Sequence, residues 1–149
     1  MMAERLYFAY GSNMEEAQMA FRCPGSTSLG IAWLTNHRFI INDRGVASIV
    51  ESEGRVVYGL LWDISETDER QLDRYEGVRK GFYRKSTVSV GVQENQTVDA
   101  LVYVASSNEH GKPRPGYMER IIRAAKDLGV PTQVLEEFKT WLEIEAQST

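Results

Sequence analysis

Runs of hydrophobic residues, separated by short polar segments, divide the first half of the chain into strand-like pieces. An aromatic and apolar run ends at Tyr10, and a second strand-like segment covers 30–41. A short alternating strand follows at 46–50, and a polar turn at 52–55 separates it from the apolar run 56–64. The last of these runs is typical of a buried central strand.

The second half of the chain combines one hairpin with clear helical periodicity. Residues 83–92 and 97–104 are strand-like and pair around a polar turn at 94–96. Apolar residues recur at helical spacing over 117–128, and Gly129 ends this segment. The pattern therefore predicts a β-hairpin followed by an amphipathic helix.

Capping residues mark another helix between the apolar run 56–64 and the hairpin. Ser65, with Asp68 three residues later, is typical of a helix start. Leu72 and Tyr75 are expected to face inward from this helix, and Gly77 closes it.

About six strands and three or four helices define an α+β domain in which strands and helices do not alternate regularly. A closed or nearly closed sheet with helices packed outside it is the preferred architecture, rather than a doubly wound parallel sheet. The 149 residues are most simply one domain, 1–149, large enough for a core without disulfides or metals. Thr132 caps a final predicted helix. Its Phe138 and Trp141 pack either on this domain, as we expect, or on the partner subunit of a possible homodimer.

Composition narrows the class of protein. Hydrophobic residues make up 42% of the chain and charged residues 26%, values typical of globular domains. The net charge of −4 gives no support to a nucleic-acid partner or an anionic membrane surface. No apolar run is long enough to span a bilayer, and the N-terminus lacks a secretion signal, so we expect a cytoplasmic protein without a membrane partner.

A single cysteine, Cys23, excludes an internal disulfide and fits a reducing compartment. It lies in no local Cys-His signature, so a small buried residue is a better interpretation than a nucleophile. Two histidines and one cysteine show no ligand spacing. We therefore expect neither a metal nor another cofactor.

The most informative segment is the turn Gly11-Ser12-Asn13, which follows the run ending at Tyr10 and precedes a helix-prone segment at 14–22. Such a turn leaves backbone N–H groups unpaired beside the positive end of a helix, and these can bind a carboxylate or phosphate. The alternative is a simple helix cap, in which Ser12 or Asn13 pairs with a glutamate at position 15 or 16.

Glu76 lies at the C-terminal end of a predicted helix, where the helix dipole disfavours negative charge. It is either a functional carboxylate or a tolerated surface residue paired with a nearby arginine or lysine. Tyr83 and Tyr117, weighed on residue type alone, are most simply core residues.

Taken in order, several segments resemble the γ-glutamyl cyclotransferase family. The matching segments are 8–14 (Phe-Ala-Tyr-Gly-Ser-Asn-Met), 22–25 (Arg-Cys-Pro-Gly), 46–49 (Val-Ala-Ser-Ile), 57–62 (Val-Tyr-Gly-Leu-Leu-Trp), 72–78 (Leu-Asp-Arg-Tyr-Glu-Gly-Val) with 81–83, and 117–131. The resemblance implies a mixed-sheet β-barrel flanked by helices. It also implies a carbon–nitrogen lyase activity that converts a small γ-glutamyl compound to 5-oxoproline and an amine or amino acid.

The resemblance also implies roles for particular residues. Tyr10, Gly11, Ser12 and Asn13 match the family's substrate-cradling loop, and Glu76 matches its general acid/base. Tyr83 and Tyr117 match pocket tyrosines. Because the substrate's own α-amine attacks its γ-carbonyl, no nucleophilic side chain or cofactor is needed, but Glu76 needs a raised pKa to act as a base.

The turn at 41–46 is shorter than in many members of the family, which concerns the width and specificity of the pocket. Three substrate classes stay open: γ-glutamyl amino acids, γ-glutamyl amines or γ-glutamylated secondary metabolites, and, least favoured, glutathione. A catalytically idle module that binds a small anion in the same loop is the alternative from a different class.

Overall fold

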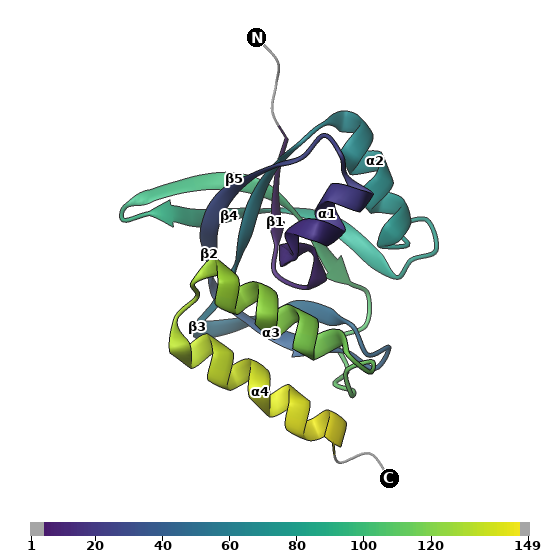
Figure 1. Cartoon of the computed structure of the whole chain (residues 1–149), viewed down its shortest axis with the longest axis vertical. Helices are drawn as coiled ribbons and strands as arrows, with labels where there is room; N and C mark the ends of the chain where they lie inside the picture. Colours follow the sequence, from purple (N-terminus) through teal and green to yellow (C-terminus); the bar gives the residue numbers. More distant parts are fainter. Residues whose placement is uncertain (1–4, 147–149) are drawn as a thin grey trace.

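In the computed structural model, which describes residues 5–146, five strands close into a barrel with helices packed outside it (Figure 1). The strand order is β1-β3-β2-β4-β5, and β1 pairs in parallel with β5 while the other pairs are antiparallel. The strands are β1 (Arg5–Ala9), β2 (Thr27–Ile41), β3 (Ala47–Ile64), β4 (Tyr83–Gln93) and β5 (Gln96–Ala105). The helices are η1 (Ser12–Met14), α1 (Glu16–Arg22), α2 (Glu66–Tyr75), α3 (Tyr117–Leu128) and α4 (Thr132–Ala146). The predicted α+β class and closed mixed sheet are confirmed.

The expected strand count of about six was too high by one, because the segments 46–50 and 56–64 belong to the single strand β3. The predicted turn residues 52–55 lie opposite Asn36 of β2, where the pairing register shifts. Gly54 and Asn36 both have positive φ, 81° and 61°, and the Gly54 N–H donates to Asn36 Oδ1 at 3.0 Å. The local turn chemistry therefore makes a bulge in a long hairpin, not the end of a strand.

Helix α2 begins as the sequence predicts. Ser65 Oγ accepts the Asp68 N–H at 3.0 Å, and Asp68 Oδ2 accepts the Ser65 N–H at 3.1 Å, which completes a capping box. Leu72 is fully buried as expected, but Tyr75 is 47% exposed, contrary to the prediction. The helix ends at Tyr75, so the residue after it, Glu76, is the C-cap.

The segment after β1 differs from the predicted helix over 14–22. A 3-10 turn, η1, comes first, and α1 begins only at Glu16. Among the described residues no side chain caps either element, so the alternative of a helix cap at Ser12 or Asn13 is wrong. The reason is that Asn13 is buried and engaged elsewhere: its Nδ2 donates to Tyr7 Oη at 3.0 Å, and its Oδ1 accepts from Gln18 Nε2 at 2.9 Å.

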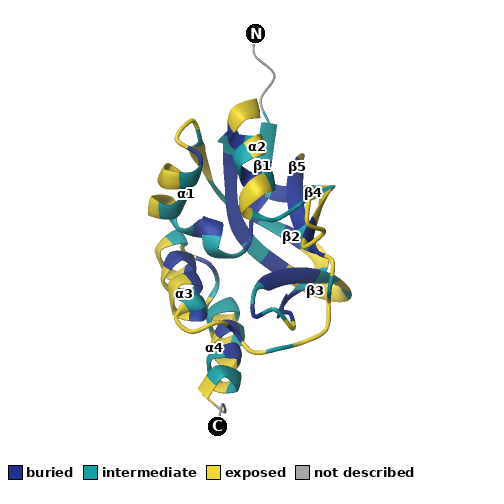
Figure 2. Ribbon diagram, turned by 90° about the vertical axis from the view of Figure 1, so that its right-hand side faces the viewer, coloured by how far each residue is buried: buried dark blue, intermediate teal, exposed yellow. Residues whose placement is uncertain are grey.

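The buried faces of α3 and α4 point toward the barrel (Figure 2). Phe138 packs against Phe39 with ring centroids 4.8 Å apart, and Trp141 packs edge-on against His110 at 5.6 Å. Phe138 and Trp141 therefore contribute to the core of their own chain, the first of the two expectations. Within residues 5–146, no helix has the length and apolar character needed to cross a membrane.

Candidate active site

One cavity of about 270 Å³ lies where the turn after β1, the end of α2, the start of β4 and the start of α3 meet. Its wall includes residues from both halves of the chain, brought together by closure of the barrel. All seven residues singled out from the sequence line it: Tyr10, Gly11, Ser12, Asn13, Glu76, Tyr83 and Tyr117.

The turn after β1 offers backbone donors to this cavity. Among the described residues, the N–H groups of Gly11, Ser12 and Asn13 have no acceptor. A Cβ on Gly11 would lie 3.2 Å from Ala47 Cβ and 3.6 Å from Tyr117 Oη, so glycine permits the close packing of the turn against β3 and α3. Because α1 begins later, at Glu16, any anion bound here would be held by the N–H groups of the turn itself.

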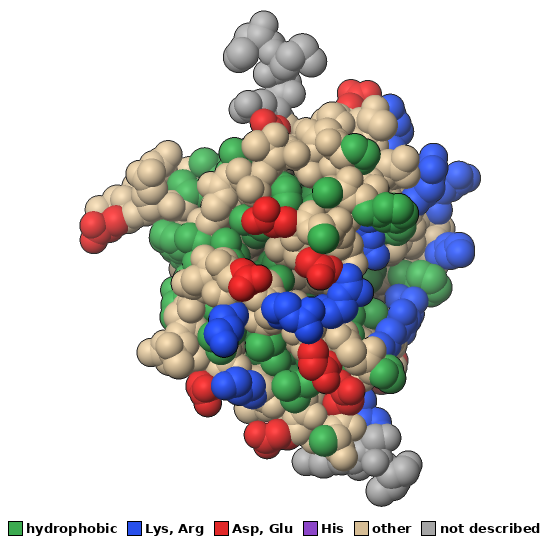
Figure 3. Space-filling view, viewed as in Figure 1, with side chains coloured by type: hydrophobic (Ala, Val, Ile, Leu, Met, Phe, Trp, Pro, Cys, Tyr) green, Lys and Arg blue, Asp and Glu red, His purple; other side chains and the backbone are tan. Residues whose placement is uncertain are grey.

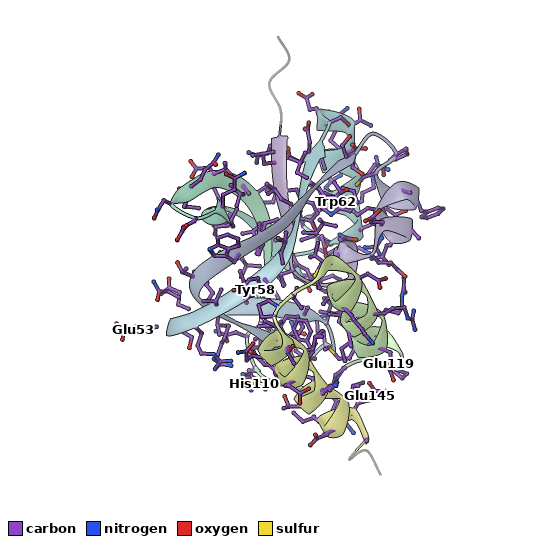
Figure 4. All side chains as sticks on the ribbon, turned by 60° about the vertical axis from the view of Figure 1, so that its left-hand side comes forward. Glu53, Tyr58, Trp62, His110, Glu119 and Glu145 are labelled. Carbon is purple, nitrogen blue, oxygen red and sulfur yellow. The ribbon has the colours of Figure 1, made fainter. Side chains whose placement is uncertain are left out.

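The side chains of this turn mainly stabilise it. Tyr10 Oη donates to the backbone oxygen of Tyr103 at 2.6 Å, and the indole N–H of Trp62 donates to the backbone oxygen of Asn13 at 3.1 Å (Figure 4 labels Trp62). Ser12 Oγ accepts from Gln18 Nε2 at 2.9 Å, which leaves its own proton available to a ligand. The turn is therefore fixed before any ligand arrives.

Tyr83 and Tyr117 both form hydrogen bonds with the backbone of one residue, Ala47. Tyr83 Oη donates to the backbone oxygen of Ala47 at 2.6 Å, and the Ala47 N–H donates to Tyr117 Oη at 3.0 Å. Burial raises the pKa of Tyr117 to about 12, so its hydroxyl stays protonated near neutral pH. Its proton has no acceptor within residues 5–146 and can be donated to a ligand.

Glu76 supplies the carboxyl group of the cavity. It is half-buried, and its backbone N–H donates to Leu72 O at 2.8 Å, which fixes it at the end of α2. Within the described part of the chain its carboxyl group makes no hydrogen bond or ion pair. Burial raises its pKa to about 7, and the positive charge of Arg22 opposes this rise. Such a group can both accept and donate a proton near neutral pH.

Four arginines that the sequence reading did not select also line the cavity: Arg22, Arg44, Arg114 and Arg120. Lys and Arg side chains gather between α1 and α3 and along the adjacent right-hand edge of the face in Figure 3. Arg22 belongs to one of the segments that resemble the cyclotransferase family, which was an available signal. Arg44 lies in the turn at 41–46, whose short length concerns the pocket, but nothing in the sequence pattern marked this side chain.

Cys23 is fully buried, and burial raises the pKa of its thiol to about 12. It does not line the cavity, in agreement with its interpretation as a small buried residue. Among residues 5–146, no group of three His, Cys, Asp or Glu side chains is placed to hold a metal ion.

Comparisons with known proteins identify the family and several relatives of this chain. The model of the AIG2-like family matches residues 56–138. The chain is 30% identical over 144 residues to the γ-glutamylcyclotransferase of Homo sapiens. The aligned residues cover 90% of this chain and 77% of that protein. It is also 30% identical over 138 residues to the γ-glutamylcyclotransferase of Bos taurus, covering 86% of this chain and 73% of that protein.

Solved structures of related proteins have the same fold as this chain. A structure described as γ-glutamyl cyclotransferase superposes with a TM-score of 0.85 at 29% identity, over 92% of this chain and 87% of that one. YkqA from Bacillus subtilis superposes with a TM-score of 0.78 at 25% identity, over 93% of this chain and 54% of that one. The fold is therefore that of the γ-glutamyl cyclotransferases. The chain belongs to the AIG2-like, γ-glutamylcyclotransferase family.

Proposed function

We propose that the protein is a γ-glutamyl cyclotransferase that releases 5-oxoproline and an amine or amino acid from a γ-glutamyl compound. One observation carries the proposal: a carboxyl group with a pKa of about 7, that of Glu76, lines the same cavity as the N–H groups of the Gly11 turn. Membership of the family supports the same activity.

The reaction needs one bond to form and one to break. The α-amine of the substrate attacks its own γ-carbonyl carbon, a ring C–N bond forms, and the bond to the departing nitrogen breaks. Nucleophile and electrophile share one molecule, so holding them in the reactive geometry is worth on the order of 7–11 kcal/mol. The protein therefore needs to fold the substrate and move protons, with no covalent intermediate on a side chain.

Glu76 is the group we assign to the protons. An α-ammonium cannot attack, so the carboxylate of Glu76 first accepts its proton. The carboxylic acid then donates a proton to the departing nitrogen, which returns Glu76 to its starting state. A carboxyl group with a pKa of about 7 suits both steps, whereas an ordinary glutamate is a weaker base.

The turn after β1 would bind the negative charge of the substrate. The N–H groups of Gly11, Ser12 and Asn13, which have no acceptor within residues 5–146, suit either its α-carboxylate or the oxyanion that forms at the γ-carbonyl. The proton of the Tyr117 hydroxyl is a further donor in the same cavity. Removal of one such donor from an oxyanion site commonly lowers turnover by about 100-fold or more.

The test is incubation with γ-glutamyl-L-alanine and detection of 5-oxoproline by mass spectrometry. Glu76→Gln should abolish turnover while calorimetry shows that the dipeptide still binds. Glu119→Gln is the matched control, since Glu119 is exposed on α3 (Figure 4) and does not line the cavity. Substantial 5-oxoproline release by Glu76→Gln would reject the role of this carboxyl group.

A substrate panel separates the remaining alternatives. γ-Glutamyl-L-alanine, a γ-glutamyl amine and glutathione, compared in parallel time courses, rank the substrate classes. Binding of all three without any 5-oxoproline would favour the catalytically idle anion-binding module instead.

A further inference from the structure

Arg44 has an unusual position in the wall of the cavity. It is half-buried, and its guanidinium carbon lies 3.7 Å from the ring centroid of Phe82. Within residues 5–146, its side chain donates no hydrogen bond and has no Asp or Glu within ion-pair distance. A guanidinium stacked on an aromatic ring uses its face, so the N–H groups at its edge stay free.

The other arginines of the cavity are engaged differently. Arg120 is paired with Glu15 and also donates to Gln18 Oε1 at 3.0 Å. Arg22 also lies over an aromatic ring, 4.5 Å from the centroid of Tyr75, but it donates in addition to Asn13 Oδ1 at 3.1 Å. Arg114 is exposed and uses its Nε–H to donate to the backbone oxygen of Arg44 at 3.0 Å. Arg44 is thus the cavity arginine that, within the described part of the chain, keeps its full set of side-chain donors.

The backbone around Arg44 is held firmly. Asn42 is buried, its Oδ1 accepts the Arg44 N–H at 3.0 Å, and its Nδ2 donates to Ser107 O at 3.1 Å. Gly45 follows with a φ of 81°, and its oxygen accepts the Arg114 N–H at 3.1 Å. The short turn at 41–46 therefore presents the Arg44 side chain from a fixed position, which reduces the entropy lost when it binds a ligand.

Arg44 and Arg22 act on different parts of the cavity. Burial raises the pKa of the Tyr83 hydroxyl far above its usual value, and Arg44 is the positive charge that opposes this rise. Arg22 is the positive charge that opposes the rise at Glu76. The cavity thus has positive charge beside the acid/base and, separately, beside Tyr83. A γ-glutamyl amino acid likewise carries two carboxylates, one on the glutamyl group and one on the departing amino acid.

We propose that Arg44, stacked on Phe82, binds a carboxylate on the departing amine and so selects γ-glutamyl compounds whose leaving group is negatively charged. The planar fork of a guanidinium pairs with a carboxylate through two parallel hydrogen bonds, a geometry that a neutral carboxamide cannot match. This inference rests on the proposed cyclotransferase function.

The test compares two substrates that differ only in this charge, γ-glutamyl-L-alanine and γ-glutamyl-L-alaninamide. We expect the wild-type kcat/KM to be at least about tenfold higher for the acid. In Arg44→Gln the ratio of the two kcat/KM values should fall to near one. The reason is a higher KM for the acid, with kcat for the acid and the kinetics of the amide little changed. Arg44→Lys, which keeps the charge but not the fork, should retain part of the preference. Arg79→Gln is the control, because Arg79 is exposed and lies outside this cavity.

The outcomes separate this inference from the proposed function. Release of 5-oxoproline from both substrates with equal efficiency would overturn the role of Arg44 and leave the cyclotransferase activity intact. An equal loss for both substrates in Arg44→Gln would also overturn it. If neither substrate yields 5-oxoproline, the proposed function fails, and calorimetry with the same two compounds decides whether Arg44 discriminates between them in binding.

Discussion

The raised pKa of Glu76 predicts a stability effect that is independent of any substrate. Burial favours the protonated carboxyl group in the folded chain, with a pKa of about 7 against 4.5 for an ordinary glutamate. Below about pH 4.5 both states are protonated, and Glu76 costs nothing. As the pH rises, the unfolded chain loses its proton first, so folding stability falls until the pH exceeds about 7.

The magnitude follows from the two pKa values. A difference between 4.5 and about 7 corresponds to about 3 kcal/mol, at about 1.4 kcal/mol for each pKa unit. Glu76 as a residue is only half-buried, and solvent screening reduces the expected cost to about 1–3 kcal/mol. Glu76→Gln removes the ionisation, so the variant should be more stable than the wild type by about this amount at pH 8.5 and by less than about 1 kcal/mol at pH 5.

Urea unfolding followed by tryptophan fluorescence at pH 5 and pH 8.5 measures the difference. Glu119→Gln, which removes an exposed carboxyl group, should shift stability similarly at both pH values. A gain for Glu76→Gln that is the same at both pH values, or larger at pH 5, would refute the argument that burial raises this pKa. The raised pKa of Glu76 also predicts a pH dependence of catalysis. The kcat/KM for γ-glutamyl-L-alanine should rise with pH through about 7, because the carboxyl group of Glu76 must be ionised to act as a base.

Two further predictions concern the supports of the site. Tyr83→Phe removes the donor to the Ala47 oxygen and should lower the free energy of unfolding by about 1–2 kcal/mol in urea titrations. Tyr58→Phe (Tyr58 is labelled in Figure 4) is its control, since the Tyr58 hydroxyl makes no hydrogen bond within residues 5–146. Equal losses in the two variants would contradict the prediction. Ser65→Ala removes the cap of α2 and should cost about 1 kcal/mol, measured by thermal unfolding. Ser65→Thr should restore most of this, and no loss in Ser65→Ala would argue against the cap.

Local patterns determined the elements whose stabilising interactions are themselves local. The helix predicted over 117–128 has these bounds in the structure, because its apolar face and Gly129 fix both its register and its end. The hairpin predicted at 83–92 and 97–104 forms as β4 and β5, each within a residue of its predicted limits. Asn95, with a φ of 63°, makes the turn between them.

Non-local pairing decided where local reasoning was wrong. The turn residues at 52–55 are typical of a chain reversal, but ladder hydrogen bonds to β2 on both sides carry the strand through them as a bulge. Asn13 has the chemistry of a helix cap, but a bond to the Tyr7 hydroxyl satisfies its side chain. Tyr75 follows the helical period toward the core, yet it lies exposed beneath the guanidinium of Arg22.

The sequence by itself determined the motif residues of the candidate site. Gly11 was marked by the turn before a helix, Glu76 by its place at a helix end, and both by the family resemblance. Only the tertiary structure decided that these residues share one cavity, because closure of the barrel joins segments about 65 residues apart. It also placed Arg44 in the cavity wall, through a turn fixed by Asn42 and the segment before α3. The physical reason is that burial and long-range hydrogen bonding depend on the whole fold, and no local pattern encodes them.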